Sequence, residues 1–234
     1  MEYELNDQNY HLYINKYGFD MLCKSIIIQP YWFQSLTTLC IRNNHIGNKG
    51  VEFIAIYKPK FLKYLYLGNN DIDKDGAKII ADELICKSLT DLHLDANNIG
   101  DEGVKYITES LYVNKSLTRL YLGSNNIGNK GAEYIANMLK INKFLRFIDL
   151  GGNNISNVCA ITESLRFNKC LDTLYLNGNN IDNMEIILIN ELLKINKINK
   201  EKLKKEYEEL KIYILIFLLL KSWQFEFLEF LNKI

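Results

Sequence analysis

Three polar residues that could do chemistry, Asp91, His93 and Asp95, alternate along one short segment. Alternate residues of a β-strand share one face, and an imidazole with two carboxylates can ligate zinc. Successive side chains on one face of a strand lie about 7 Å apart, which is too far for all three to reach one ion. Arg119 on the next predicted strand is a readier partner for Asp91. We therefore predict a solvated polar patch here, with no metal, no cofactor and no catalytic site.

Other motifs do not point to catalysis. The three histidines lie far apart in the chain, and no Ser/His/Asp or Cys/His set has supporting context. Glycine pairs such as Gly128/Gly131 lack both the lysine-serine of a phosphate-binding loop and the third glycine of a dinucleotide-binding turn. The 28 basic and 28 acidic residues balance, whereas phosphate binding favours a net positive face. We expect a protein that is not an enzyme and does not bind nucleic acid.

The cysteines and the N-terminus indicate the compartment. Five cysteines are an odd number with no regular spacing, and the first residues form neither a basic nor an apolar stretch of a signal peptide. We expect an intracellular, cytoplasmic protein with reduced thiols. Cys159 and Cys170 are expected to be buried and inert.

An eleven-residue pattern occurs six times between Leu36 and Ile181: Leu, two variable residues, Leu or Ile, one variable residue, Leu or Ile, two variable residues, Asn, one variable residue, Ile. The alternating apolar residues in its middle predict a strand with one buried face. Apolar residues at helical spacing follow, for example Ala132, Ile135 and Leu139. The six copies predict an α/β solenoid of leucine-rich repeats, with a curved parallel sheet inside, helices outside and helical caps. The copies begin at Leu36, Leu62, Leu89, Leu117, Leu145 and Leu171.

The asparagine of the pattern lies where the chain turns away from each strand. Its amide can bond backbone groups that the turn leaves unpaired, and a buried polar group is tolerated only when bonded in this way. We predict a structural ladder of Asn44, Asn70, Asn97, Asn125, Asn153 and Asn179.

The fourth copy reads Leu-Tyr-Leu-Gly-x-Asn-x-Ile-Gly-x-x-Gly-Ala-x-x-Ile-Ala-x-x-Leu. This motif resembles the ribonuclease-inhibitor-like subclass of leucine-rich repeats, and the resemblance covers residues 36–195. The resemblance implies a curved solenoid that binds another protein. The fifth and sixth copies replace the paired glycines with Ser156-Asn-Val158 and Asp182-Asn-Met184, so we expect shorter or displaced outer helices there.

Side chains between the strand leucines are expected to face solvent on the concave side of the arc. Tyrosine and arginine are enriched at binding hot spots, which makes this aromatic face a candidate contact surface. The alternative is that the repeated Leu-Tyr-Leu motif was inherited by repeat duplication and that the partner binds elsewhere on the protein. The candidate protein-binding residues are Tyr64, Tyr66, His93, Arg119, Tyr121, Phe147, Asp149 and Tyr175.

The chain is expected to divide into an N-terminal cap (1–35), the solenoid (36–195) and a C-terminal helical cap or extension (196–234). The cap at 1–35 resembles a degenerate repeat helix interrupted at Pro30. The apolar run 212–220 is shorter than the roughly 20 residues that a membrane-spanning helix needs. Three alternatives stay open for 196–234: a packed cap, a partner or self-association helix, and a membrane-surface attachment.

These observations favour a non-catalytic scaffold that binds an unidentified partner protein on the concave face. The alternatives are a regulator of an enzyme (a GTPase activator or an enzyme inhibitor, as the resemblance allows) and an adaptor recruited to membranes through its C-terminal apolar segment. The repeat turns, for example at Asp71, Asn98 and Asn126, are uniform and hold no insertion or lone arginine suited to an activator. The scaffold is therefore preferred, with no membrane contact expected and the oligomeric state open.

Overall fold

The computed structural model of the protein describes residues 2–6, 9–13, 19–28, 30–85, 88–198, 201–202 and 205. The chain divides into two compact units, Met1–Leu193 and Lys194–Ile234. The first unit holds all the repeats. In the second, residues 194–198 are helical, and most of the predicted C-terminal segment 196–234 lies outside the described residues, as does Cys86.

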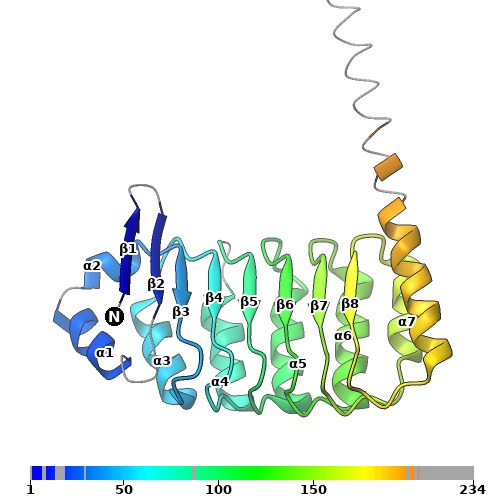
Figure 1. The fold of residues 1–234 in the computed structure, drawn as a ribbon, viewed down its shortest axis with the longest axis horizontal. Coiled ribbons are helices and arrows are strands. Elements are labelled where there is room, and N and C mark those ends of the chain that lie inside the picture. Colours follow the sequence, from blue (N-terminus) through cyan, green and yellow to red (C-terminus); the bar gives the residue numbers. More distant parts are fainter. Residues whose placement is uncertain are drawn as a thin grey trace, which may run out of the picture. The chain divides into compact units, whose positions relative to one another are not determined.

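One sheet runs through the first unit, with its eight strands in sequence order (Figure 1). The six repeat strands are parallel, and each residue pairs with the matching residue of the next repeat, as Leu92 does with Leu120. These strands are β3 (Thr38–Cys40), β4 (Tyr64–Tyr66), β5 (Asp91–His93), β6 (Arg119–Tyr121), β7 (Phe147–Asp149) and β8 (Thr173–Tyr175).

Two further strands at the N-terminus were not expected from the sequence. β1 (Glu2–Asn6) and β2 (Asn9–Tyr13) pair antiparallel, and β2 then pairs parallel with β3. The hairpin thus occupies the backbone edge that β3 would otherwise expose. The segment 1–35 also contains α1 (Phe19–Ile28) and α2 (Pro30–Gln34), so one helix ends and another begins around Pro30. Proline is well tolerated at the first position of a helix, where its missing N–H costs nothing.

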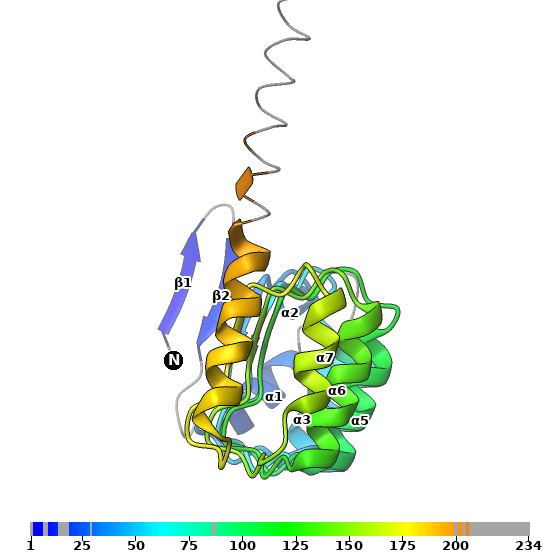
Figure 2. The ribbon, with the colours of Figure 1, turned by 90° about the vertical axis from the view of Figure 1, so that its right-hand side faces the viewer.

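The repeat helices all lie on one side of the sheet (Figures 1 and 2). The α/β leucine-rich repeat solenoid predicted from the sequence is confirmed. Residues 183–193 are helical as well. The helices are α3 (Gly47–Tyr57), α4 (Lys74–Ile79), the π-helical turn η1 (Ile80–Leu84), α5 (Gly100–Leu111), α6 (Asn129–Ile141) and α7 (Cys159–Phe167).

The core is a single cluster that continues from repeat to repeat. In the fourth copy Leu117, Leu120, Leu122 and Ile127 are all fully buried. No repeat could bury these side chains alone, because each leucine is covered by the leucine of the next repeat. The stacking of neighbours therefore holds the strands in register.

The helices after the fifth and sixth copies differ from each other. α7 has 9 residues against 13 in α6, which confirms the shorter helix predicted for the fifth copy. After the sixth copy the helix is not shorter, since it extends from residue 183 to 193 with Ile189 and Leu193 buried, but it is displaced from the stack of α5, α6 and α7 (Figure 2), the other alternative predicted. This helix covers apolar surface, so it needs several turns.

The expectation of buried cysteines in the fifth repeat was also wrong. Cys159 is exposed, because it is the first residue of α7 and lies outside the stripe that faces the core, and Cys170 is half-buried. Both thiols are free.

Among the residues that the structure describes, no helix has the length and apolar character needed to cross a lipid bilayer.

Candidate functional site

The asparagine after each strand holds the turn that follows. Asn97 Oδ1 accepts hydrogen bonds from the backbone N–H groups of Asn70 and Ile72, each at 3.0 Å. Its Nδ2 donates to the carbonyls of Leu67 and Leu94 at 3.0 and 2.9 Å. One amide thus joins two repeats through four bonds, which fixes the strand ends. Related bonds occur at Asn44, Asn70, Asn125, Asn153 and Asn179.

A second set of asparagines, not predicted from the sequence, lies at the opposite end of the strands, and two of its members, Asn142 and Asn168, join neighbouring repeats. Asn168 is fully buried; its Nδ2 donates to the carbonyls of Leu139 and Asn142, and its Oδ1 accepts from the N–H groups of Cys170 and Leu171. The sequence signal for this set is the motif Asn-Lys-x-Leu, which occurs before three of the strands. These asparagines are Asn114, Asn142 and Asn168.

The structure brings all eight candidate binding residues onto one face of β4 to β8. In one column of the sheet Tyr64, Asp91, Arg119 and Phe147 are aligned by the strand register. In the other column the aligned residues are Tyr66, His93, Tyr121, Asp149 and Tyr175.

Five of these side chains form a continuous row of rings, which we call the aromatic row. Its ring centroids are 4.3 Å apart from Tyr66 to His93, 3.7 Å from His93 to Tyr121 and 4.6 Å from Tyr121 to Phe147. Tyr175 completes the row edge-on to Phe147 at 5.2 Å. Phe147 belongs to the other column and connects Tyr121 diagonally to Tyr175, because the β7 residue aligned with these two tyrosines is Asp149, which has no ring.

Ion pairs flank the aromatic row on both sides. Arg119 Nε contacts Asp91 Oδ1 at 2.8 Å, which confirms the pairing predicted from the sequence. On the other side Arg42 pairs with Asp95. This second pair passes over Gly68, where a Cβ would lie 2.9 Å from Asp95 Oδ2. Glycine at this position therefore leaves the space in which two charges from non-adjacent repeats meet.

The central imidazole of the row is neutral at ordinary pH. Burial, and after it the positive charges of Arg42 and Arg119, lower the pKa of His93 to about 4. His93 Nδ1 lies 4.0 Å from Asp95 Oδ1, and this carboxylate does not offset the other effects because it is already paired with Arg42. Burial also raises the pKa of the Tyr121 phenol. The row is therefore an uncharged surface between two ion pairs.

The polar residues of this face are engaged with their neighbours. Asp149 Oδ1 accepts a hydrogen bond from the N–H of Gly151 at 2.8 Å. Tyr175 is half exposed and is the most accessible ring of the row. Within the described part of the chain, no group of three His, Cys, Asp or Glu side chains could hold a metal ion.

A shallow hollow of about 350 Å³ lies beside the row. Glycines of successive repeats, among them Gly123 and Gly151, form its floor because they carry no side chain. Asp95 and Asp149 contribute its carboxylates. The hollow is thus acidic and adjoins an apolar row.

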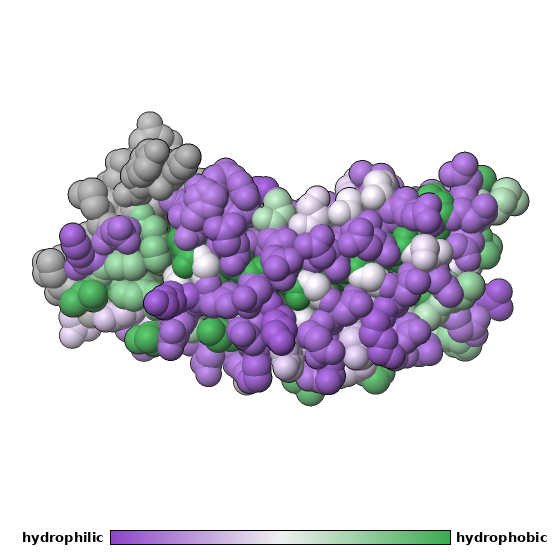
Figure 3. All heavy atoms as spheres, turned by 90° about the horizontal axis from the view of Figure 1, so that it is seen from below, coloured by the Kyte–Doolittle hydropathy of each residue, from purple (hydrophilic) through white to green (hydrophobic). Residues whose placement is uncertain are grey.

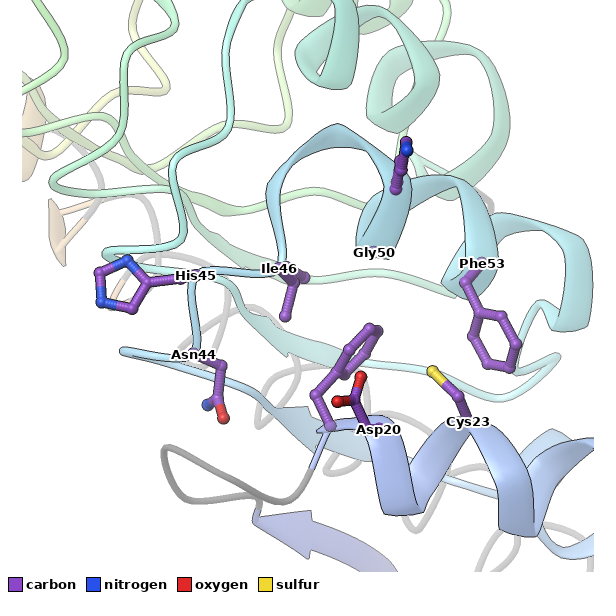
Figure 4. Close-up of a pocket in the computed structure, with 9 residues that line it drawn as sticks. Asp20, Cys23, Asn44, His45, Ile46, Gly50 and Phe53 are labelled. Carbon is purple, nitrogen blue, oxygen red and sulfur yellow. The ribbon is translucent and has the colours of Figure 1, made fainter.

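A separate hollow of about 460 Å³ lies between α1 and the start of α3 (Figure 4). Cys23 and Asp20 line it, but burial and then the charge of Asp20 raise the pKa of the Cys23 thiol, which disfavours the thiolate needed for nucleophilic attack. His45 lies on the far side of the hollow from Cys23 and bonds Asp71 Oδ2 through Nδ1 at 2.7 Å. This hollow therefore holds no nucleophile with an adjacent base.

Comparisons with known proteins agree with this architecture. A family model described as "Leucine Rich repeat" matches residues 34–55, 58–81, 86–107 and 113–136. The chain thus carries leucine-rich repeats; the ribonuclease-inhibitor-like subclass stays a prediction.

Two human proteins are similar in sequence. NACHT, LRR and PYD domains-containing protein 2 is 38% identical over 93 residues, which are 38% of this chain and 9% of that protein. NACHT, LRR and PYD domains-containing protein 5 is 35% identical over 91 residues, which are 37% and 8%. The chain matches less than a tenth of the length of these relatives.

A solved structure of leiomodin-1 actin-binding site 2 superposes with a TM-score of 0.57 at 22% identity. The match covers 69% of this chain and 94% of that one. It supports the fold.

Proposed function

We propose that this protein is a non-catalytic interaction module that binds a partner protein on the exposed face of its sheet, at the aromatic row. The observation that carries the proposal is the unbroken contact of five rings across β4 to β8. A few residues supply most of the binding energy at protein interfaces, and tyrosine, tryptophan and arginine are enriched among them. Here the rings lie side by side, with Arg119 at the border of the row.

The row is preorganised for binding. Its side chains project from short strands whose ends are held by the buried amides of Asn97, Asn125 and Asn153. A surface that is already ordered loses little conformational entropy when a partner docks. The ion pairs at its borders keep their charges satisfied, so an apolar partner segment need not leave a charge unpaired.

The acidic hollow suggests the chemistry of the partner. An apolar segment would cover the aromatic row, and a lysine or arginine beside it would enter the hollow next to Asp149, because Asp95 is already paired with Arg42. Charge complementarity of this kind favours one orientation of the partner. The similarity to leiomodin-1 supports the proposal to the extent that this fold serves as a protein-binding site in that protein.

A GTPase activator is less well supported than a scaffold. An activating arginine must be available to a partner's active site. All four arginines of this chain are already engaged. Arg42 and Arg119 pair with Asp95 and Asp91, Arg146 donates to the Cys170 carbonyl, and Arg166 lies 3.7 Å from Glu163.

Affinity capture from the source cell tests the proposal. Wild type would be compared with Tyr66→Ala/Tyr121→Ala, which removes two rings of the row. Tyr106→Ala/Tyr134→Ala is the matched control, because these two half-buried tyrosines lie on α5 and α6. Thermal unfolding of all three proteins would show that each is folded.

We expect a protein that is retained by wild type and by the control and is lost from the row variant. Direct titration of that protein should then give binding at least tenfold weaker for the row variant, about 1.4 kcal/mol. Equal capture by all three proteins would overturn the assignment to the aromatic row.

A further inference from the structure

Charge is segregated along this chain even though its net charge is zero. The chain passes from helix to strand in segments 56–63, 83–85, 88–90, 111–118, 140–146 and 166–172. These contain nine Lys or Arg residues and two acidic ones. We call this side of the molecule the basic edge.

The opposite side has the reverse balance. The strand-to-helix segments 41–50, 67–76, 94–103, 122–131, 150–158 and 176–185 contain eight acidic residues and four Lys or Arg residues. Figure 3 looks onto this side from below, and hydrophilic residues predominate on it. We call it the acidic edge.

The basic edge also exposes large apolar side chains. Val113 is 80% exposed and Phe167 is 65% exposed. Ile56, Phe61 and Ile141 are more than half exposed as well. Single exposed apolar residues are ordinary, but a series that recurs in successive repeats marks a contact surface. Lysines lie within two or three residues of each of these side chains.

The basic edge is a rigid row, since hydrogen bonds join each segment to the next. Thr90 N–H donates to the Lys63 carbonyl, Thr118 N–H to the Thr90 carbonyl, and Arg146 N–H to the Thr118 carbonyl, at 2.8 to 2.9 Å. In the later segments the Nδ2 groups of Asn142 and Asn168 donate hydrogen bonds to the carbonyls of Leu111 and Asn142 in the preceding segments. The repeats therefore present their lysines in register along one side.

Helix capping explains only part of this pattern. Lysine near a helix carboxyl end interacts favourably with the helix dipole, and Lys143 Nζ does bond the Lys140 carbonyl. Lys60, Lys63, Lys115 and Lys169 lie beyond the helix ends. Among the described residues no ion pair involves these four or Lys143. Nor does the dipole account for exposed valine and phenylalanine.

We propose that the basic edge docks on an anionic lipid membrane surface. Lysines beside the headgroups attract the negative surface charge, and interleaved apolar side chains can enter the interface between headgroups and acyl chains. The edge also has two grooves, of about 620 and 800 Å³, on either side of Lys58; Lys60 lines the first and Lys115 the second. A headgroup phosphate could enter the first groove; the second also contains Asp82 and Glu83, whose carboxylates disfavour an anion. The sheet face stays free for its own partner, so this docking is independent of the aromatic row.

Flotation of the full chain with vesicles tests the proposal. One set of vesicles contains phosphatidylcholine alone, and the other an equal mixture of phosphatidylcholine and phosphatidylserine. The edge variant is Lys115→Gln/Lys143→Gln/Lys169→Gln. Its matched control is Lys49→Gln/Lys74→Gln/Lys130→Gln, which removes the same charge from the acidic edge at exposed positions. A third variant, Val113→Ser/Phe167→Ser, removes apolar side chains and leaves the charge unchanged.

We expect wild type and the control to bind the phosphatidylserine vesicles alike and to ignore phosphatidylcholine alone. The edge variant should bind on the order of 100-fold more weakly, because each lysine near an anionic surface contributes about fivefold. The serine variant should bind at least tenfold more weakly. Every variant keeps the segment 206–234, so equal binding of edge variant and control would assign attachment elsewhere and overturn the proposal. If the protein bound soluble poly-glutamate but not the phosphatidylserine vesicles, the proposal would also be overturned, and an acidic protein partner would be indicated.

Discussion

His93 lies parallel to Tyr121, with ring centroids 3.7 Å apart and an interplanar angle of 12°. Tyr66 lies 4.3 Å from the same imidazole. The histidine is therefore desolvated by two phenol rings, and a positive charge on it would lose its hydration. This contact makes the stability of the aromatic row depend on pH.

The pKa of His93 is about 4 in the folded protein and 6.5 for a histidine exposed to water, so the unfolded chain binds more protons between these values. Stability is fully present above pH 6.5 and falls as the pH decreases towards 4, by up to about 3 kcal/mol. Urea unfolding at a series of pH values measures this slope. His93→Phe keeps a ring in the row and should flatten the slope. An unchanged slope in His93→Phe would show that another group titrates.

Asn125→Ala should destabilise the protein by roughly 1–3 kcal/mol. Asn125 is fully buried, and its Nδ2 donates to the carbonyls of Leu94 and Gly123. Alanine would remove these two bonds and the one that Asn125 Oδ1 accepts from the Ile99 N–H at 3.3 Å. The two carbonyls would keep one bond each, from Asn97 Nδ2 and from the Ala96 N–H, so the buried Ile99 N–H would lose most. Asn137→Ala on the exposed side of α6 is the control and should change stability little. Thermal unfolding curves that coincide for wild type and Asn125→Ala would contradict the role of the ladder.

Asn168→Ala tests the second set of asparagines and should cost a similar amount, roughly 1–3 kcal/mol. Four bonds at 2.7 to 3.0 Å join its amide to two repeats. The loss would be largest near the C-terminal repeats, because Asn168 joins the segments before β7 and β8. Amide hydrogen exchange in Asn168→Ala, compared with wild type, should therefore be accelerated more around β7 and β8 than around β4. Uniform exchange across the sheet would mean that these bonds stabilise nothing locally.

Gly68→Ala and Gly103→Ala should differ in their effects. At Gly68 a Cβ meets only the ends of the Asp95 and Arg42 side chains, which can move away. We expect a loss below about 1 kcal/mol, because the broken ion pair is partly exposed. At Gly103 a Cβ would lie 2.5 Å from Ile99 Cγ2 and 3.3 Å from the Lys74 backbone, so the loss should be about 1–3 kcal/mol. Chemical denaturation of the two variants measures their free energies of unfolding. Equal losses of stability would contradict this account.

Ala96→Gly should stabilise the protein by up to about 1 kcal/mol. Ala96 has a φ of 55°, a conformation that is costly for residues with a Cβ and free for glycine. The equivalent positions of the last two repeats hold Gly152 and Gly178, with φ of 64° and 73°. Ala160→Gly in α7 is the control and should destabilise by about 1 kcal/mol. A lower melting temperature for Ala96→Gly would show that the backbone there is not strained.

Much of the fold could be predicted because its signal is local and repeated. Leu120 and Leu122 alternate as a strand requires, and the same alternation recurs in each copy, so register and layer order follow from stacking like on like. The pairing of Asp91 with Arg119 was predictable for the same reason. The hairpin of β1 and β2 was not, because that segment does not share the repeat pattern.

The repeat, the buried leucines and the shared face of Tyr66, His93 and Tyr121 can be predicted from the sequence, since each depends only on spacing along the chain. The tertiary structure alone decided that Phe147 crosses between columns to complete the aromatic row, that Arg42 reaches Asp95 above Gly68, and that basic and acidic segments fall on opposite sides. Those relationships depend on side-chain size and direction across neighbouring repeats. They arise only when segments distant in sequence are brought within a few ångströms of one another.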